Sequence, residues 1–473
     1  MHAPSPPLGN VDDRGFWPTL MAVLGGASLD YTRGSLSRSV WLLAVPMVLE
    51  MAMESTFAVV DLWFVGQLGK AAVATVGLTE SMMAIVYAIG LGLAMSTTAM
   101  VARRVGEGDL GGAARAGAQA ITLVALLGVC LGAPCVFFGG DLLGLMGASP
   151  AAVEQGSTYT SLVLGSHIVV LLLFVQNAIF RGAGDAMLAM KSLWFANLLN
   201  CLLDPLFIFG WGPVPAMGVT GAGVATLCGR GFGVLYQIMA LRRGRGRLDL
   251  SRAVWKLDVG AMATLVRLSA FGIGQFLIAT ASWVVLNAFA ARFGDASAAG
   301  YTVGVRILVF TYLPAWGLSN AVGTLVGQNL GAKDPARAER ATWQVMRYNV
   351  AFMSAVGLLM LLIPEFLVAP FSDETEVRAI AAQCLRVFSI GYPMFALGMV
   401  LVQALNGAGD TVTPTWINLI AYWLVEIPVA WTLAVDLSWG ASGVFWSVVI
   451  GESLMAVLAL AIFLRGKWKT RAL

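Results

Sequence analysis

An apolar run from Trp41 to Gly69 is long enough to cross a bilayer as one helix, and eleven further runs like it follow along the chain. A membrane-spanning helix takes about 20 apolar residues. The runs have a helical period rather than the alternation of strands, which argues against an outer-membrane barrel. Of the 473 residues, 58% are hydrophobic and only 12% are charged, too few charges to cover a soluble chain of this length. We therefore predict an all-α polytopic membrane protein.

Twelve membrane-spanning helices are predicted, at residues 40–65, 72–98, 116–138, 156–180, 190–210, 219–241, 262–291, 298–324, 343–368, 380–404, 414–435 and 441–464. An even number of spans places both ends of the chain on the same side of the membrane. Lys and Arg gather in one set of connecting segments, which includes the run Arg242–Lys256, whereas the opposite set contains only Lys70, Arg292 and Arg378. Because basic loops stay on the cytoplasmic side, both termini are predicted to be cytoplasmic.

An internal repeat divides the chain into two halves. A shift of 225 residues places the GAGD sequence at 182–185 on the GAGD sequence at 407–410, and the same shift aligns residues 101–115 with 326–340. Each copy follows an even-numbered span, so the six-span halves run in the same orientation. Two such lobes around a central path are typical of transporters that rock between inward and outward openings.

The repeat predicts five segments: a cytoplasmic N-terminal segment (1–39), a six-helix lobe (40–241), a cytoplasmic linker (242–260), a second six-helix lobe (261–464) and a cytoplasmic tail (465–473). The linker is basic, and a basic mid-chain segment is also found in nucleic-acid patches. A connection between two membrane lobes explains it better, so no nucleic-acid partner is expected.

Three acidic residues of the first span, Glu50, Glu54 and Asp61, lie on one helix face at about 100° per residue. Acidic side chains at membrane depth are costly unless they face a bundle interior or a water-filled cavity, where they carry protons, ions or cationic ligands. The alternative is that they only form structural hydrogen bonds to neighbouring helices. We predict that Glu50 and Glu54, together with Asn177 and Asn197 of later spans, bind substrate or relay protons.

A second polar stripe lies in the fifth span, where Asn197, Asn200 and Asp204 are spaced by three and four residues. Pro205 follows directly, and a proline within a span frees a backbone carbonyl. The carboxylates of Asp61 and Asp204 and the amide of Asn200, together with a hydroxyl, can share a proton or bind a hard cation such as Na⁺, and Thr226 is a weaker candidate for the hydroxyl. Asn177 could reach the same cavity. A structural hydrogen-bond network is the alternative.

The two halves differ in their acids. The shift of 225 places Asp61 on Leu286 and Asp204 on Val429, and the seventh span has no acid. We therefore expect the cation chemistry mainly in the first lobe. The second lobe has three intramembrane polar residues of interest, Gln275, Glu426 and Glu452. Glu426 precedes a proline by two positions, and stabilising a kink is the simpler role for it.

Neither nucleotide hydrolysis nor enzymatic catalysis is predicted. The chain has no GxxxxGK[ST] loop and no soluble segment large enough to hold one, and no arrangement of nucleophile and base stands out. Transport would therefore be driven by an ion gradient, with no cofactor beyond the coupling ion, H⁺ or Na⁺.

The sequence resembles the multidrug and toxic compound extrusion (MATE) family over nearly its whole length, from Asp30 to about Phe463. The resemblance rests on DYTRGSLSRSVWLLAVPM (30–47), VVDLWFVGQLG (59–69), RRVGEGD (103–109), FRGAGDAMLAM (180–190), NLLNCLLDPLFIFG (197–210), MGVTGAGVAT (217–226), GQNLGAKDPARAE (327–339) and LNGAGDTVTPTWIN (405–418). Each motif is weak alone, and together they are specific.

The resemblance implies a secondary antiporter in a bacterial inner membrane, acting as a monomer. Such a protein exports organic, often cationic and amphipathic compounds in exchange for H⁺ or Na⁺. The chain looks closest to DinF-type members, whose first-lobe cation site matches Asp61, Asn200, Asp204 and Thr226, with Asn177 nearby. NorM-type members use an acid in the seventh span, and residues 271–293 have none. Glu50 and Glu54 are outside the general family pattern.

Two other functions agree less well with the sequence. A flippase for a lipid-linked precursor usually has a cationic central cavity and often additional spans, whereas this chain has twelve spans and an acidic first lobe. A passive channel is disfavoured by the two-lobe repeat.

Overall fold

The structure is a computed structural model that describes residues 9–10, 15, 17–19, 21, 29–244, 246–250 and 258–471. Much of the predicted N-terminal segment 1–39 and part of the predicted linker therefore lie outside the described residues. Within the described part, two short strands pair in parallel, β1 (Gly9–Asn10) with β2 (Leu29–Asp30). All other regular structure is helical.

The helices of the first half are α2 (Leu36–Gly66), α3 (Lys70–Gly106), α4 (Leu110–Leu145), α5 (Pro150–Gly165), α6 (His167–Ala183), α7 (Ala186–Phe209) and α8 (Val219–Arg242). Those of the second half are α9 (Val259–Ala291), α10 (Asp295–Gly331), α11 (Pro335–Leu362), α12 (Pro364–Val368), η2 (Ala369–Phe371), α13 (Thr375–Gly407), α14 (Val412–Asn418), η3 (Leu419–Glu426), α15 (Ile427–Trp431), η4 (Thr432–Asp436), α16 (Ala441–Leu464) and η5 (Lys467–Thr470).

Twelve spans in the described part are long and apolar enough to cross a membrane, which confirms the predicted number. Two spans are less regular than predicted. The fourth is broken at Ser166 into α5 and α6, and the eleventh, Val412–Asp436, contains the two π-helical segments η3 and η4. π-helical turns are rare and often occur at functional sites.

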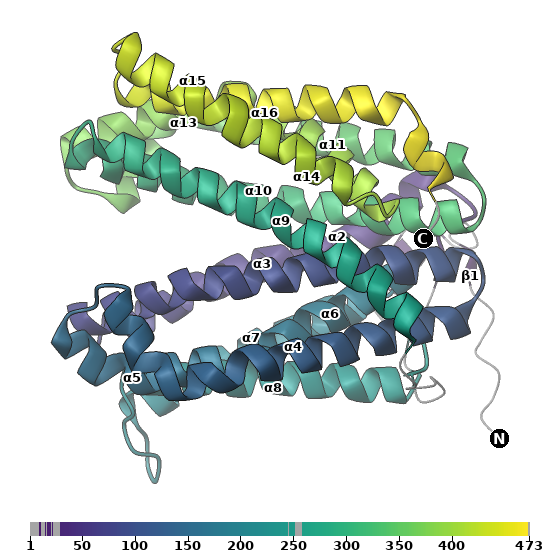
Figure 1. The fold of residues 1–473 in the computed structure, drawn as a ribbon, viewed down its shortest axis with the longest axis horizontal. Helices are drawn as coiled ribbons and strands as arrows, with labels where there is room; N and C mark the ends of the chain where they lie inside the picture. The colour runs from purple at the N-terminus through teal and green to yellow at the C-terminus, as the bar shows by residue number, and fades with distance from the viewer. Residues whose placement is uncertain are drawn as a thin grey trace.

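The two halves form two bundles that lie side by side, α2–α8 in purple to teal and α9–α16 in green to yellow (Figure 1). The start of α2 and the end of α16 lie at the same end of the bundles, as an even number of spans requires. We call this the terminal end.

The first helix of each half crosses to the other half at the terminal end. Met47 of α2 packs in a core cluster that consists mainly of second-half residues, whereas Val65, near the other end of α2, packs within the first half. α9 does the reverse, because Leu265 is buried in the first-half core and Leu286 in the second-half core. One end of the first helix of each half therefore packs in the core of the other half.

Glycines allow close packing of α3 against α10 at the terminal end. A Cβ on Gly106 would lie 1.9 Å from the carbonyl oxygen of Gln328, and a Cβ on Gly331 would lie 2.2 Å from the carbonyl oxygen of Arg103. Such overlaps are impossible without movement of the backbone. Small residues let membrane helices approach this closely.

Side-chain hydrogen bonds that join the halves also lie toward the terminal end. The hydroxyls of Ser37 and Tyr348 are 2.8 Å apart, and those of Ser96 and Ser269 are 2.6 Å apart. Gln328 Nε2 donates to the carbonyl oxygen of Gly182 at 2.9 Å. These bonds and the glycine contacts close the two bundles against one another at this end.

The segment after α8 packs against the first half. Leu248 and Leu250 are buried in the first-half core, and the backbone N–H of Arg247 donates to Asp185 Oδ2 at 2.5 Å. Burial lowers the pKa of the Arg247 guanidinium, although the nearby carboxylates of Asp30 and Asp185 act in the opposite direction. Residue 245 and residues 251–257 of the predicted linker lie outside the described residues.

Candidate functional site

Three helices bring together Asp61, Asn200, Asp204 and Thr226, which we call the Asp61–Asp204 site. Asn200 Nδ2 on α7 donates to Thr226 Oγ1 on α8 at 3.2 Å. The charges of Asp61 on α2 and Asp204 on α7 are close enough to act on one another. The structure thus places all four predicted residues in one region. Their role in ion coupling stays a prediction.

The Asp61–Asp204 site has an excess of hydrogen-bond acceptors. Both carboxylate oxygens of Asp204, Oδ1 of Asp61 and Oδ1 of Asn200 are buried and have no hydrogen-bond partner in the described part of the chain. Buried polar atoms are normally paired, because leaving one unpaired costs about 1–3 kcal/mol. A bound proton or a hard cation would satisfy these oxygens.

Close packing of α7 against α8 sets the distance between Asn200 and Thr226. A Cβ on Gly229, three residues after Thr226, would lie 2.8 Å from Asn200 Cβ and 2.7 Å from the carbonyl oxygen of Ala196. Only glycine fits there without a shift of the helices.

No described cluster of three or more His, Cys, Asp or Glu side chains could hold a metal ion. The Asp61–Asp204 site offers two carboxylates, one amide and one hydroxyl. This composition suits an ion that is bound and released better than a resident transition metal.

A second polar layer contains Glu54. Asn197 Nδ2 donates to Glu54 Oε2 at 3.3 Å, and Arg230 Nη2 lies 3.9 Å from Glu54 Oε1. Tyr87 OH donates to Glu80 Oε2 at 3.5 Å, and the charge of Arg230 acts on Glu80 as well. Two carboxylates therefore share one arginine in this layer.

A third polar layer contains Glu50, whose side chain is only 1% exposed. Arg181 Nη2 lies 2.6 Å from Glu50 Oε1, and Asn177 Nδ2 donates to the same oxygen at 3.3 Å. Gln237 Nε2 in turn donates to Asn177 Oδ1 and to Ser192 Oγ. A buried ion pair inside a hydrogen-bond network results.

The three acids of α2 face the interior of the first half, as their spacing predicted, but at three depths. At 1.5 Å per residue, Glu54 lies about 6 Å and Asp61 about 16 Å along the axis from Glu50. Asn177 does not join the Asp61–Asp204 site as we expected, because it belongs to the Glu50 layer. Asn197 belongs to the Glu54 layer.

Arg181 follows the predicted end of the fourth span (156–180), which places it in a basic connecting segment, and this prediction is wrong. Arg181 lies in the last turn of α6, and its side chain is 14% exposed. The sequence contained a signal for this pairing: Glu50 lies within a span, and a buried acid normally has a cationic partner. Glu80 was missed, although it is an acid within a predicted span and the same reasoning applies to it.

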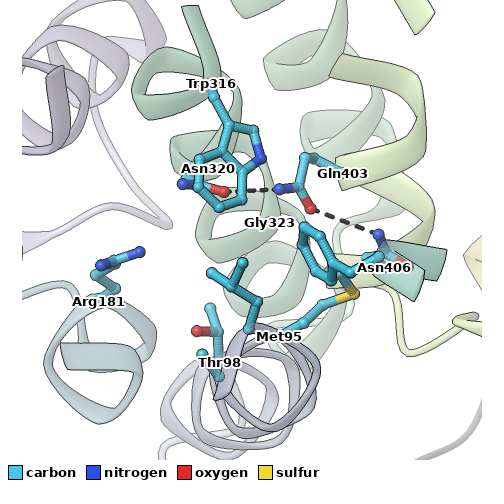
Figure 2. A pocket seen from close by; sticks show the side chains of 12 residues that line it. Met95, Thr98, Arg181, Trp316, Asn320, Gly323, Gln403 and Asn406 are labelled. Atoms are coloured by element: carbon cyan, nitrogen blue, oxygen red, sulfur yellow. Dashed lines mark hydrogen bonds between the residues drawn. The ribbon is translucent and has the colours of Figure 1, made fainter. Parts of the chain in front are cut away.

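Between the two halves lies a pocket that is partly open to solvent (Figure 2). One side is formed by first-half residues and the other by second-half residues; its lining comprises Leu91, Ala94, Met95, Thr98, Arg181, Phe276, Trp316, Asn320, Gly323, Gln403, Asn406 and Gly407. Gln403 Nε2 donates to Asn320 Oδ1 at 2.6 Å, and Asn406 Nδ2 donates to Gln403 Oε1 at 3.5 Å. Arg181 reaches in from the opposite side.

The cavity combines aromatic faces with polar groups. Phe276 and Trp316 meet edge to face, with ring centroids 6.1 Å apart. Gln275 and Asn406 exchange amide hydrogen bonds of 3.2 Å behind the lining. Arg181 belongs both to the cavity and to the Glu50 layer, so it connects the cavity with the polar interior of the first half.

Comparison with known families gives two matches in this chain. The sequence profile of the MatE family matches residues 46–206 and residues 273–432, one stretch in each half. Together these cover well over half of the chain. The two matches agree with the internal repeat found in the sequence.

Curated relatives match along nearly their whole length. The chain is 27% identical to the probable multidrug resistance protein NorM of Thermotoga maritima over 439 residues, which cover 91% of this chain and 92% of the relative. It is 28% identical to the probable multidrug resistance protein NorM of Mesorhizobium japonicum, with 90% and 93% covered. The relatives do not specify the DinF-like branch, which stays a prediction.

Solved structures share the fold. The outward-facing conformation of a multidrug resistance MATE family transporter of the MOP superfamily superposes with a TM-score of 0.86 at 24% identity, covering 93% of this chain and 98% of the other. A MOP superfamily transporter from Pyrococcus furiosus gives a TM-score of 0.87 at 23% identity, with the same shares covered.

Proposed function

This chain belongs to the MATE family of multidrug transporters, and we propose that it is a secondary antiporter that exports organic compounds in exchange for H⁺ or Na⁺. The observation that carries the proposal is the set of four buried, unpartnered oxygens in the Asp61–Asp204 site. A site with more acceptors than donors can bind a proton or a cation and release it again. No nucleotide or other cofactor is required.

The coupling ion acts through α2. Binding of a proton or cation between Asp61 and Asp204 removes the repulsion between their charges. α2 carries Asp61 at one end of the first half and crosses to the second half at the terminal end. A change in how α2 packs on α7 therefore alters the contact between the halves.

The terminal end is cytoplasmic in this proposal, because the basic connecting segments lie on that side. The membrane would then be the inner membrane of a bacterium, and the protein would act as a monomer. Since the contacts between the halves described above close this end, the conformation is open toward the outside. An ion from outside reaches Asp61 in this conformation, and the substrate leaves.

The cavity of Figure 2 is the substrate site in this proposal. Trp316 and Phe276 offer aromatic faces for flat apolar groups and for organic cations. The amides of Asn320, Gln403 and Asn406 offer donors and acceptors for polar groups. The charge of Arg181 is balanced by Glu50, so the lining does not repel a cation as an unpaired arginine would. Organic, often cationic and amphipathic compounds fit this lining.

The test is efflux of a fluorescent organic cation from proteoliposomes under an imposed H⁺ gradient or Na⁺ gradient, each applied alone. We expect Asp61→Asn and Asp204→Asn to abolish gradient-driven efflux. Asp141→Asn is the matched control, because Asp141 is an exposed acid in the last turns of α4. Undiminished gradient-driven transport by Asp61→Asn contradicts the mechanism. Flipping of a labelled lipid-linked sugar without efflux of cations would favour the flippase alternative instead.

A further inference from the structure

The second half contains two buried carboxyl groups that the proposed mechanism does not use. Glu426 ends the π-helical segment η3, and Glu452 lies in α16; their side chains are 2% and 5% exposed. Both lie in predicted spans, where a carboxylate is costly without a partner. The charge of Glu452 acts on Glu426.

Hydroxyl groups supply the hydrogen bonds of this pair. Tyr422 OH donates to Glu452 Oε1 at 3.1 Å, and Ser282 Oγ on α9 donates to Glu426 Oε2 at 3.4 Å. Glu452 Oε2 is completely buried and has no partner in the described part of the chain. A buried carboxylate oxygen without a donor is unfavourable, and protonation removes its charge and turns this oxygen into a hydrogen-bond donor.

No cation compensates the pair. None of the ion pairs among the described residues includes Glu426 or Glu452. The other titratable groups that act on them are tyrosines: Tyr422, on the same span as Glu426, and Tyr301 and Tyr312 on α10. Gly451, next to Glu452 in the sequence, packs directly on Glu426, and two negative charges in such a low-dielectric interior disfavour one another.

The pair occupies the second-half counterpart of the Asp61–Asp204 site. The first, fifth and sixth spans of a half build each site: α2, α7 and α8 in the first half, and α9, η3 and α16 in the second. The glycine contact is repeated too. A Cβ on Gly229 would lie 2.8 Å from Asn200 Cβ, and a Cβ on Gly451 would lie 2.8 Å from Glu426 Cβ.

We propose that Glu426 and Glu452 form a second proton-binding site, which holds a proton on Glu452 Oε2 and exchanges it during the transport cycle. The proton leaves the pair with one negative charge instead of two, and its release and return add one proton to each cycle. The site goes beyond the proposed function, because it does not depend on whether Asp61 and Asp204 bind the coupling ion.

The test is infrared difference spectroscopy of the purified full chain in lipid between about pH 5 and about pH 9, a range in which a carboxyl group held protonated by its surroundings changes state. It is done in the Asp61→Asn/Asp204→Asn background, which removes the signal of the Asp61–Asp204 site. We expect a protonated-carboxyl band that disappears with rising pH and is absent in Glu452→Gln. Glu365→Gln, which alters a half-exposed acid paired with Arg386, should leave the band unchanged.

Tyr422→Phe is the second variant, because it keeps both carboxyl groups and removes only the hydroxyl that donates to Glu452. Because this hydrogen bond to a charged group is lost, the pH at which half of the band has disappeared should rise by about one to two units. A band that persists in Glu452→Gln, that ignores pH, that follows Na⁺ instead of pH, or whose midpoint is unmoved in Tyr422→Phe would overturn the proposal.

Discussion

Replacement of Glu50 by Gln removes one charge of a buried ion pair and keeps the shape of the side chain. Arg181 then loses the carboxylate at 2.6 Å, while its own side chain stays only 14% exposed. Loss of one partner of a buried pair costs about 3–5 kcal/mol, because the other charge is left uncompensated. Arg181 keeps some contact with solvent at the cavity, so we expect about 3 kcal/mol.

Thermal unfolding of the purified protein measures this loss. One kcal/mol shifts the Tm by about 2–4 °C in a unit of 150–250 residues, which is the size of one half of this chain. The expected decrease is therefore about 6–12 °C. Glu365→Gln is the control, since Glu365 and Arg386 are 65% and 48% exposed and such pairs contribute about 0–1 kcal/mol.

Arg181→Gln in the Glu50→Gln background completes the cycle. Removal of both charges leaves no uncompensated ion, so the double variant should be more stable than Glu50→Gln alone. The reasoning would be refuted if Glu50→Gln and Glu365→Gln had the same Tm. It would also be refuted if the decrease in stability of the double variant equalled the sum of the decreases of Glu50→Gln and Arg181→Gln.

Three further results are expected. Thr226→Val removes the acceptor of Asn200 Nδ2 and should raise the H⁺ or Na⁺ concentration for half-maximal efflux about tenfold; an unchanged value would separate Thr226 from the site. Gly331→Val forces a side chain against the carbonyl oxygen of Arg103, so the two halves should separate at the terminal end. A cysteine placed at Thr98 should then react about tenfold faster with a thiol reagent added from that side, and an unchanged rate would contradict this expectation. Trp316→Ala removes an aromatic anchor of the cavity and should weaken substrate binding in equilibrium titration at least tenfold; unchanged binding would exclude Trp316 from the substrate site.

Much of the fold follows from apolar run lengths and from the repeat. The backbone irregularities do not. The break at Ser166 coincides with the Gly165–Ser166 pair, a common position for a helix kink, but apolar run length does not report this signal. The π-helical segments of the eleventh span cannot be recognised from a 3.6-residue hydrophobic period. Hydrophobic periodicity reports which face is buried, not how each turn is closed.

The candidate site, too, was predicted only in part from the sequence. Spacing within a helix correctly predicted that Asn200 and Asp204 share a stripe and that the acids of α2 face inward. It could not predict partners on other helices, so the place of Asn177 and the pairing of Arg181 with Glu50 were not found. The acidic pair of the second half escaped the comparison of the halves, because a single fixed shift aligned Asp204 with an apolar residue.

The crossing of α2 and α9 also bears on how this architecture could arise. Each half buries its first helix partly against the other, through residues such as Met47 and Leu265. A half produced alone would leave those apolar surfaces without a partner. A single-half ancestor would therefore have folded as a dimer with exchanged first helices, and a chain cut directly after Leu250, which still packs on the first half, should assemble only when both fragments are made in the same cell.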